Sequence, residues 1–223
     1  MLKSELAGRR CPLCHAVLRA MLQGLLLLLL ANPHCLLPNA WMTYVALLRG
    51  INLLGYNRLP MKDLAAMFTA GGCTGVKTYI ASGNVVFSCP AAVKKTIARH
   101  IEAEVQRGYG FKCIFTTRSR EEMEAVLRAN PFLKKTDDGA RLHVAFLADA
   151  PTPEGIAAVN ATFRERSPGD DLKILGREVY LHLPNGMAGS KLRNDYLDSR
   201  LKTMSTTRNW NTVKKLAEMM AQA

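Results

Sequence analysis

The sequence predicts an α+β protein: a ferredoxin-like plait in βαββαβ order, followed by a second βαββα unit and a C-terminal helix. Two observations support this. Short runs rich in β-branched residues alternate with longer segments whose apolar residues recur every three or four positions. A Ser-Gly-Asn triplet at 82–84 also separates two such runs, which is typical of a hairpin. The plait is expected over residues 42–117 and the second half, with the C-terminal helices, over 118–223.

The first half begins with an apolar strand at Thr43–Leu48. Both of its faces are apolar, which places it in the middle of a sheet. A glycine- and asparagine-bearing loop follows, and Pro60 suits the first turn of a helix that Gly71-Gly72 ends. The other expected elements are strands at 76–81 and 85–88, a helix from Val93 to Val105 with an apolar residue every four positions, and a strand at 111–116.

The second half is marked by helix caps. Ser119-Arg120-Glu121-Glu122 is a capping box that opens a helix ending near Asn130-Pro131. Thr152-Pro153 begins another helix, and Ser190 is expected to cap a third. The remaining expectations are strands at 142–147, 172–175 and 178–183, a polar cluster at 205–211, and a last helix from near Trp210.

The first 41 residues do not fit this pattern. Residues 20–31 are an apolar run too short to span a bilayer, which takes about 20 residues, so no integral membrane span is predicted. With basic residues in front, the run is similar to a signal peptide, but no small-x-small cleavage site follows. We expect translation to begin at Met42; export is the alternative. The Cys11-Pro12-Leu13-Cys14-His15 string matches a haem-attachment motif but precedes the apolar run, and we interpret it as a chance match.

Charge and cysteine content indicate partners and compartment. The formal net charge is +12, of which the tail carries +3, so +9 belongs to the rest of the chain. Such an excess favours phosphate-containing small molecules or nucleic acid as partners; a basic protein without such a partner is the alternative. Outside the tail, Cys73, Cys89 and Cys113 follow no disulfide framework, which indicates free thiols and a cytoplasmic location. The sequence does not set the oligomeric state.

A ligand site is predicted at one edge of the first sheet. In a plait the first two strands run in the same direction, so the loop after Leu48 and the turn after Ala81 emerge together. Such bends expose backbone N–H groups to an anion, and an arginine can add a forked charge. A second polar cluster lies before the last helix, whose N-terminus also attracts anions. The predicted ligand-binding residues are Arg49, Asn52, Asn57, Ser82, Gly83, Asn84, Lys191, Arg208 and Asn209.

Structural interpretations of these residues stay open. Ser-Gly-Asn also makes an ordinary hairpin turn, and Arg49 could pair with an acid such as Asp63. Asn209 could serve only as the N-cap of the last helix.

Catalytic patterns are sparse. The chain after residue 41 contains no H-E-x-x-H, G-x-S-x-G or C-x-x-C motif, and His143 and His182 are interpreted as packed or surface residues. No cofactor, metal or catalytic residue is predicted. An enzyme using the same pocket, with Arg49 and the turn amides as electrostatic stabilisers, is one alternative. RNA binding on an open sheet face, with Tyr44 and Phe87 as stacking platforms, is another.

Four strings of this sequence identify a family resemblance. They are Y-V-A-L-L-R-G-I-N, N-R-L-P-M-K-D-L, T-Y-I-A-S-G-N-V-V-F and T-T-R-N-W-N-T-V-K-K-L. Together they resemble DUF1697, a bacterial family of domains of unknown function, from Thr43 to about Leu216. One difference is that Leu53-Leu54-Gly55 stands where the family usually has Val-Gly-Gly. The resemblance implies the fold and a start near Met42, and it implies no reaction.

Overall fold

The structure is a computed structural model that describes residues 40–53 and 55–223, of which 41–223 form one compact unit. Three predictions concern the tail, and their tests lie outside the described residues. They are the start at Met42, the apolar run at 20–31 and the haem-attachment string.

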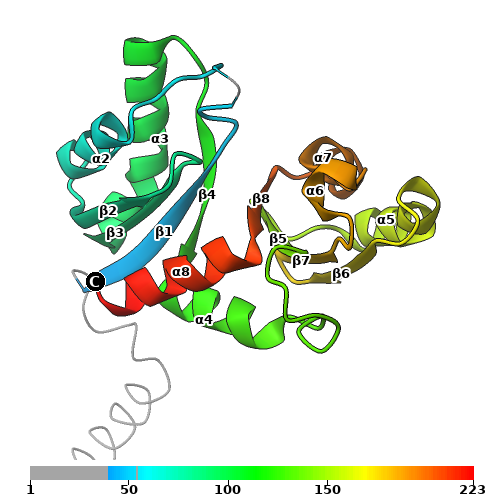
Figure 1. The fold of residues 1–223 in the computed structure, drawn as a ribbon. Coiled ribbons are helices and arrows are strands. Elements are labelled where there is room, and N and C mark those ends of the chain that lie inside the picture. The colour runs from blue at the N-terminus through cyan, green and yellow to red at the C-terminus, as the bar shows by residue number, and fades with distance from the viewer. Residues whose placement is uncertain (1–39, 54) are drawn as a thin grey trace, which may run out of the picture. The chain divides into compact units, whose positions relative to one another are not determined.

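The first half forms a four-stranded antiparallel sheet in the order β2-β3-β1-β4 (Figure 1). β1 and β2 each pair antiparallel with β3, which lies between them, so they run in the same direction. This is the strand order that the predicted plait requires. The four strands are β1 (Trp41–Arg49), β2 (Thr74–Tyr79), β3 (Asn84–Pro90) and β4 (Ile114–Ser119).

The second half repeats the same sheet in the order β6-β7-β5-β8. Its last strand, β8, covers Ser205–Asn209, where the sequence analysis placed only a polar cluster; that assignment was wrong. The strand was missed because its buried side chains are hydrogen-bonded threonine, serine and arginine, so the sequence shows no alternation of apolar residues there. The other strands are β5 (Leu142–Leu147), β6 (Asp171–Leu175) and β7 (Glu178–His182).

Helix starts follow the predicted caps, with one exception. The Ser119 capping box is present, Thr152 accepts from the Gly155 N–H, and Asn209 caps the last helix. The exception is Ser190, which follows a short helix instead of opening a long one. The helices are α2 (Met61–Ala70), α3 (Ala91–Tyr109), α4 (Arg120–Ala129), α5 (Pro153–Arg166), α6 (Gly186–Gly189), α7 (Asn194–Leu201) and α8 (Trp210–Ala221).

Each sheet is covered on both faces. The outer face of the first sheet packs on α2 and α3, and that of the second on α5 and α7. The inner faces share a third core with α4 and α8, which lie side by side (Figure 1). Val45 and Leu47 enter this core from β1, and Val144 and Phe146 enter from β5. The two halves are therefore related repeats joined by a common apolar core.

Candidate functional site

The first half contains two bends, the loop after β1 and the turn between β2 and β3. They lie side by side, as the strand order predicts. The Leu48 N–H donates to the Gly83 carbonyl at 2.8 Å, and Asn52 Nδ2 donates to the Ala81 carbonyl at 2.9 Å. The loop after β1 is thus tied directly to the turn between β2 and β3.

Two left-handed asparagines shape the loop after β1. Asn52 has φ 53° and Asn57 has φ 51°, a region in which asparagine is one of the few tolerated L-residues. Asn52 accepts from the Leu59 N–H at 2.8 Å and donates to the Leu59 carbonyl at 2.9 Å, while Asn57 Nδ2 donates to the Gly50 carbonyl at 2.9 Å. Both amides are therefore used to close the loop on itself.

The loop borders an open cavity of about 440 Å³. Arg58 lines it, with one guanidinium nitrogen 3.8 Å from where a Cβ on Gly55 would sit. Within the described part of the chain this guanidinium has no hydrogen bond or ion pair. Sequence reasoning missed Arg58, although residues 49–60 contain no acid that could neutralise it. The lining residues are Asn52, Gly55, Arg58, Leu59, Pro60, Met61 and Ala81.

Arg49 makes an ion pair outside this lining. Its guanidinium contacts the carboxylate of Asp198 on α7, rather than that of Asp63, and about a quarter of each side chain is exposed. Asp198 also accepts from the Ser205 N–H at 2.8 Å and from the Ser205 hydroxyl at 2.6 Å. The pair therefore links the end of β1 to α7 and β8.

Arg208 is buried and holds the two bends together from the other half. Its Nε donates to Asn84 Oδ1 at 2.6 Å, and Nη2 donates to the carbonyls of Leu48 and Ser82 at 2.6 and 3.1 Å. Burial lowers the pKa of Arg208 to about 10. Asn84 is itself fully buried and donates to the Tyr79 carbonyl at 3.0 Å. These two side chains are thus occupied in joining the halves.

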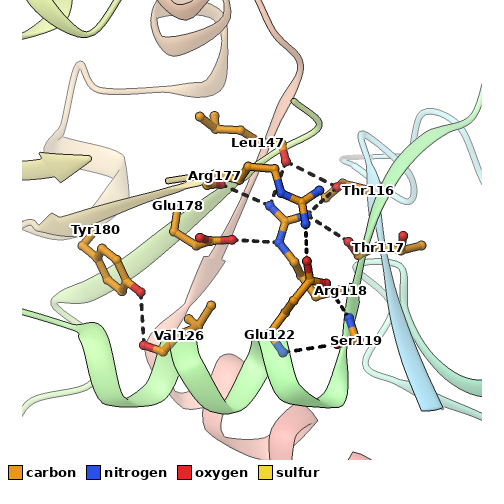
Figure 2. A network of polar contacts seen from close by, with 10 residues as sticks. All are labelled: Thr116, Thr117, Arg118, Ser119, Glu122, Val126, Leu147, Arg177, Glu178 and Tyr180. Carbon is orange, nitrogen blue, oxygen red and sulfur yellow. Dashed lines mark hydrogen bonds and ion pairs between the residues drawn. The ribbon is translucent and has the colours of Figure 1, made fainter. Parts of the chain in front are cut away.

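Arg118 makes contacts equivalent to those of Arg208, but from the first half to the second (Figure 2). It reaches from β4 to the end of β5 and to the turn between β6 and β7, as Arg208 reaches from β8 to the end of β1 and the turn between β2 and β3. Glu178 takes the position of Asn84 and accepts from Arg118 Nε at 2.7 Å. The other partners of Arg118 are the Thr116 hydroxyl and the carbonyls of Thr117, Leu147 and Arg177.

A second ion pair supports this network. Arg177 contacts the carboxylate of Glu122, which also accepts from the Ser119 N–H at 2.7 Å as part of the capping box (Figure 2). Arg118 and Arg208 are two arginine clamps, because each joins one half of the chain to the other. The sequence signal for both is a repeated Thr-Thr-Arg triplet, at 116–118 and 206–208, each followed by a helix cap.

The remaining predicted residues are distributed over both halves. Ser82 accepts from Asn84 Nδ2 at 3.0 Å, and Gly83 has φ 80° with Leu48 Cβ 2.7 Å from the place of a Cβ. Lys191 lies in the second half, where its carbonyl accepts from Arg166 at 3.3 Å. Asn209 caps α8 and donates to the Ala140 carbonyl at 3.3 Å. Of the predicted set, only Asn52 lines the cavity beside Arg58.

Comparison with known proteins gives the family. A family profile described as "Protein of unknown function (DUF1697)" matches residues 42–180, more than half of the chain. The chain belongs to the DUF1697 family. It is also similar to the solved structure of the conserved bacterial protein SP0830 from Streptococcus pneumoniae, with a TM-score of 0.64 and 24% identity over 81% of this chain and 99% of that one. At that identity the likeness shows a shared fold. No curated protein matches this chain.

The resemblance noted in the sequence is therefore confirmed, and the DUF1697 strings can be placed on the fold. Y-V-A-L-L-R-G-I-N covers most of β1 and the start of its loop, and N-R-L-P carries Arg58. I-A-S-G-N is the turn between β2 and β3, and T-T-R-N-W carries Arg208 into α8. The strings used to identify the DUF1697 chain thus include the cavity rim and one of its arginine clamps.

Two further observations concern this DUF1697 chain. Among residues 40–53 and 55–223, no helix is long and apolar enough to cross a membrane. In the same residues, no group of three or more His, Cys, Asp or Glu side chains is arranged to hold a metal ion.

Proposed function

We propose that this protein binds a phosphate-bearing ligand, a nucleotide or a nucleic acid, at the cavity between the loop after β1 and the turn between β2 and β3. The observation that carries the proposal is that Arg58 lines the cavity and that its guanidinium has no counter-ion among the described residues. A guanidinium offers a planar fork of donors that matches a phosphate group.

The local backbone supports the same assignment. Three of the four non-glycine residues with positive φ in the described chain lie in these two bends: Asn52, Asn57 and Ile80. A β-branched residue such as Ile80, at φ 47°, rarely adopts this region, and such conformations concentrate at functional sites. The hydrogen bonds from Asn52 to the carbonyls of Leu59 and Ala81 tie the segment next to Arg58 to the neighbouring turn, and order present before binding lowers the entropy cost of binding.

The proposed site differs in composition from the set expected from the sequence. Asn52 and Asn57 would shape the site by closing the loop after β1. Four other residues would hold the turn between β2 and β3 against that loop: Ser82, Gly83, Asn84 and Arg208. Arg49 lies where that loop begins, and it would support the loop through its ion pair with Asp198. Lys191 and Asn209 would contact the ligand only if it extended over the second half, as a nucleic acid could.

Enzyme activity in the same cavity remains the second candidate, with Arg58 rather than Arg49 as the electrostatic stabiliser. The RNA-binding alternative loses its platform, because both faces of the first sheet are covered and Phe87 is fully buried.

The test is binding of ATP and of a single-stranded RNA oligonucleotide to the full chain and to Arg58→Ala. We expect Arg58→Ala to weaken binding of at least one probe about tenfold, the scale of a lost charge-assisted hydrogen bond. The thermal midpoint should stay unchanged because the side chain is exposed.

Arg128→Ala is the matched control. It removes the same charge from α4, where the arginine is 72% exposed and pairs only loosely with Glu124. Equal effects of the two variants would mean that only net charge matters, and the cavity proposal would then fail. A steep fall of affinity with salt indicates several phosphate contacts and so a nucleic acid, whereas a shallow fall indicates a nucleotide.

A further inference from the structure

Two buried cysteines of the first half face each other across neighbouring strands. Thr74, the first residue of β2, pairs with Ser88 of β3. Continuing this antiparallel register by one residue places Cys73, which directly precedes β2, opposite Cys89. Both side chains enter the same core between the first sheet and α2 and α3. Each thiol shifts the pKa of the other, which is consistent with two sulfur atoms that lie close together. This proximity was not predicted, because sixteen positions separate the two residues.

We propose that Cys73 and Cys89 form a reversible disulfide, which makes this strand end an oxidation-sensitive modification site. Directly opposed residues of an antiparallel pair have Cα atoms about 4.5–5.5 Å apart, within the range of about 4.4–6.8 Å that a disulfide spans. The cross-link therefore requires rotation of two side chains and little backbone movement.

The surroundings assign different roles to the two thiols. The neighbouring Cys73 thiol and the ammonium of Lys94 lower the pKa of Cys89, whereas the neighbouring Cys89 thiol raises the pKa of Cys73. We therefore assign Cys89 as the attacking thiol and Cys73 as the resolving thiol, an order that the variants below test. Cys113, the third cysteine of this core, has its pKa raised to about 12 by burial and serves as an internal control.

The chemistry balances with hydrogen peroxide as oxidant. The Cys89 thiolate attacks one peroxide oxygen: an S–O bond forms, the O–O bond breaks, and hydroxide leaves and is protonated to water. Cys73 then attacks the sulfenic sulfur: the S–S bond forms, the S–O bond breaks, and a second water leaves. Both thiols are reduced in the structure, and a dithiol reductant reverses the step by exchange.

Access to the pair fits its position in the fold. Both thiols are buried, so only a small oxidant can reach them. β2 is an edge strand, and Cys73 directly precedes it, between the Gly71-Gly72 turn and Thr74. Ends of edge elements open at low free energy, which exposes the pair transiently without global unfolding.

Peptide mapping of the full chain after peroxide treatment tests the proposal, because Lys77 separates the two cysteines. Trypsin yields peptides 63–77 and 78–94, each with one cysteine, which a disulfide joins. We expect this pair to dominate the cross-links of the native chain and to be released by dithiothreitol. In urea the cross-links should spread over the six cysteines of the chain. Absence of the 63–77/78–94 pair, or the same share of it in urea, would overturn the proposal.

Variants separate the two roles. Cys113→Ala should keep the cross-link, whereas Cys89→Ala should abolish it; circular dichroism checks that each variant folds. With dimedone as a trap for sulfenic acid, Cys73→Ala should be labelled at Cys89, and Cys89→Ala should show at least several-fold less label at Cys73. The reverse labelling pattern would refute the assigned order of attack.

Discussion

Replacing Arg118 by methionine removes a clamp between the two halves, and the structure sets the size of the effect. The Arg118 side chain is fully buried, and the side chain of its partner Glu178 is only 16% exposed. Methionine keeps most of the aliphatic volume but leaves that carboxylate without its cation and the Leu147 carbonyl without its strongest donor. Breaking a buried ion pair from one side costs about 3–5 kcal/mol, a large share of a typical stability of about 5–15 kcal/mol.

The partner substitution should cost much less. In the other half the neutral amide of Asn84 accepts from the buried Arg208, which shows that this fold satisfies a guanidinium without a carboxylate. Glu178→Gln keeps such an acceptor, so we expect a loss of about 1 kcal/mol, typical of one hydrogen bond exchanged for a weaker one.

Equilibrium urea unfolding measures both effects, followed by circular dichroism with unchanged m-values as the test of two-state behaviour. Arg120→Met is the control, because this arginine forms an exposed pair with Glu124 on the same helix and its loss should cost under about 0.5 kcal/mol. The reasoning is refuted if Arg118→Met costs less than about 1 kcal/mol, or if Glu178→Gln costs as much as Arg118→Met.

Three other predictions concern backbone, cap and pH. Gly83→Ala should destabilise by about 2–4 kcal/mol in the same assay, because it combines positive φ with a Cβ overlap on Leu48, whereas Gly75→Ala, at φ 60° in open space, should cost about 1 kcal/mol; equal losses would contradict the overlap. Ser119→Ala should lower stability by about 1 kcal/mol by removing the cap of α4, and an unchanged thermal midpoint would argue against it. Burial lowers the pKa of His143, so its contribution is present above the unfolded value of about 6.5 and is lost as pH falls. His143→Leu should therefore flatten the fall of the urea midpoint between about pH 7 and 5, and an unchanged slope would show that other groups cause it.

Local rules predicted much of the fold. The hairpin around Gly83, the capping box at Ser119 and the Thr152 cap lie where the sequence placed them, since each depends on a few neighbouring residues. The strand β8 was missed because its burial depends on partners from the other half: the Thr206 hydroxyl donates to the Leu48 carbonyl at 3.3 Å. An isolated polar pentapeptide carries no trace of such a partner.

The meeting of the two bends was also predictable, because strand order alone brings the loop after β1 to the turn between β2 and β3. The use made of their side chains was not. Arg208 and Arg58 are both arginines in polar segments, and only the packing decides that the first is buried against carbonyls while the second lines a cavity.

The sequence by itself determined the family, the α+β plait and the edge at which the two bends converge, because periodicity, caps and turn residues act over short distances. Only the tertiary structure decided which cations are engaged, since ion pairs such as Arg49 with Asp198 join residues about 150 positions apart. Burial turns an arginine into a clamp when carbonyls surround it and leaves it available to a ligand when none do. That choice depends on how two repeats pack, which no single segment encodes.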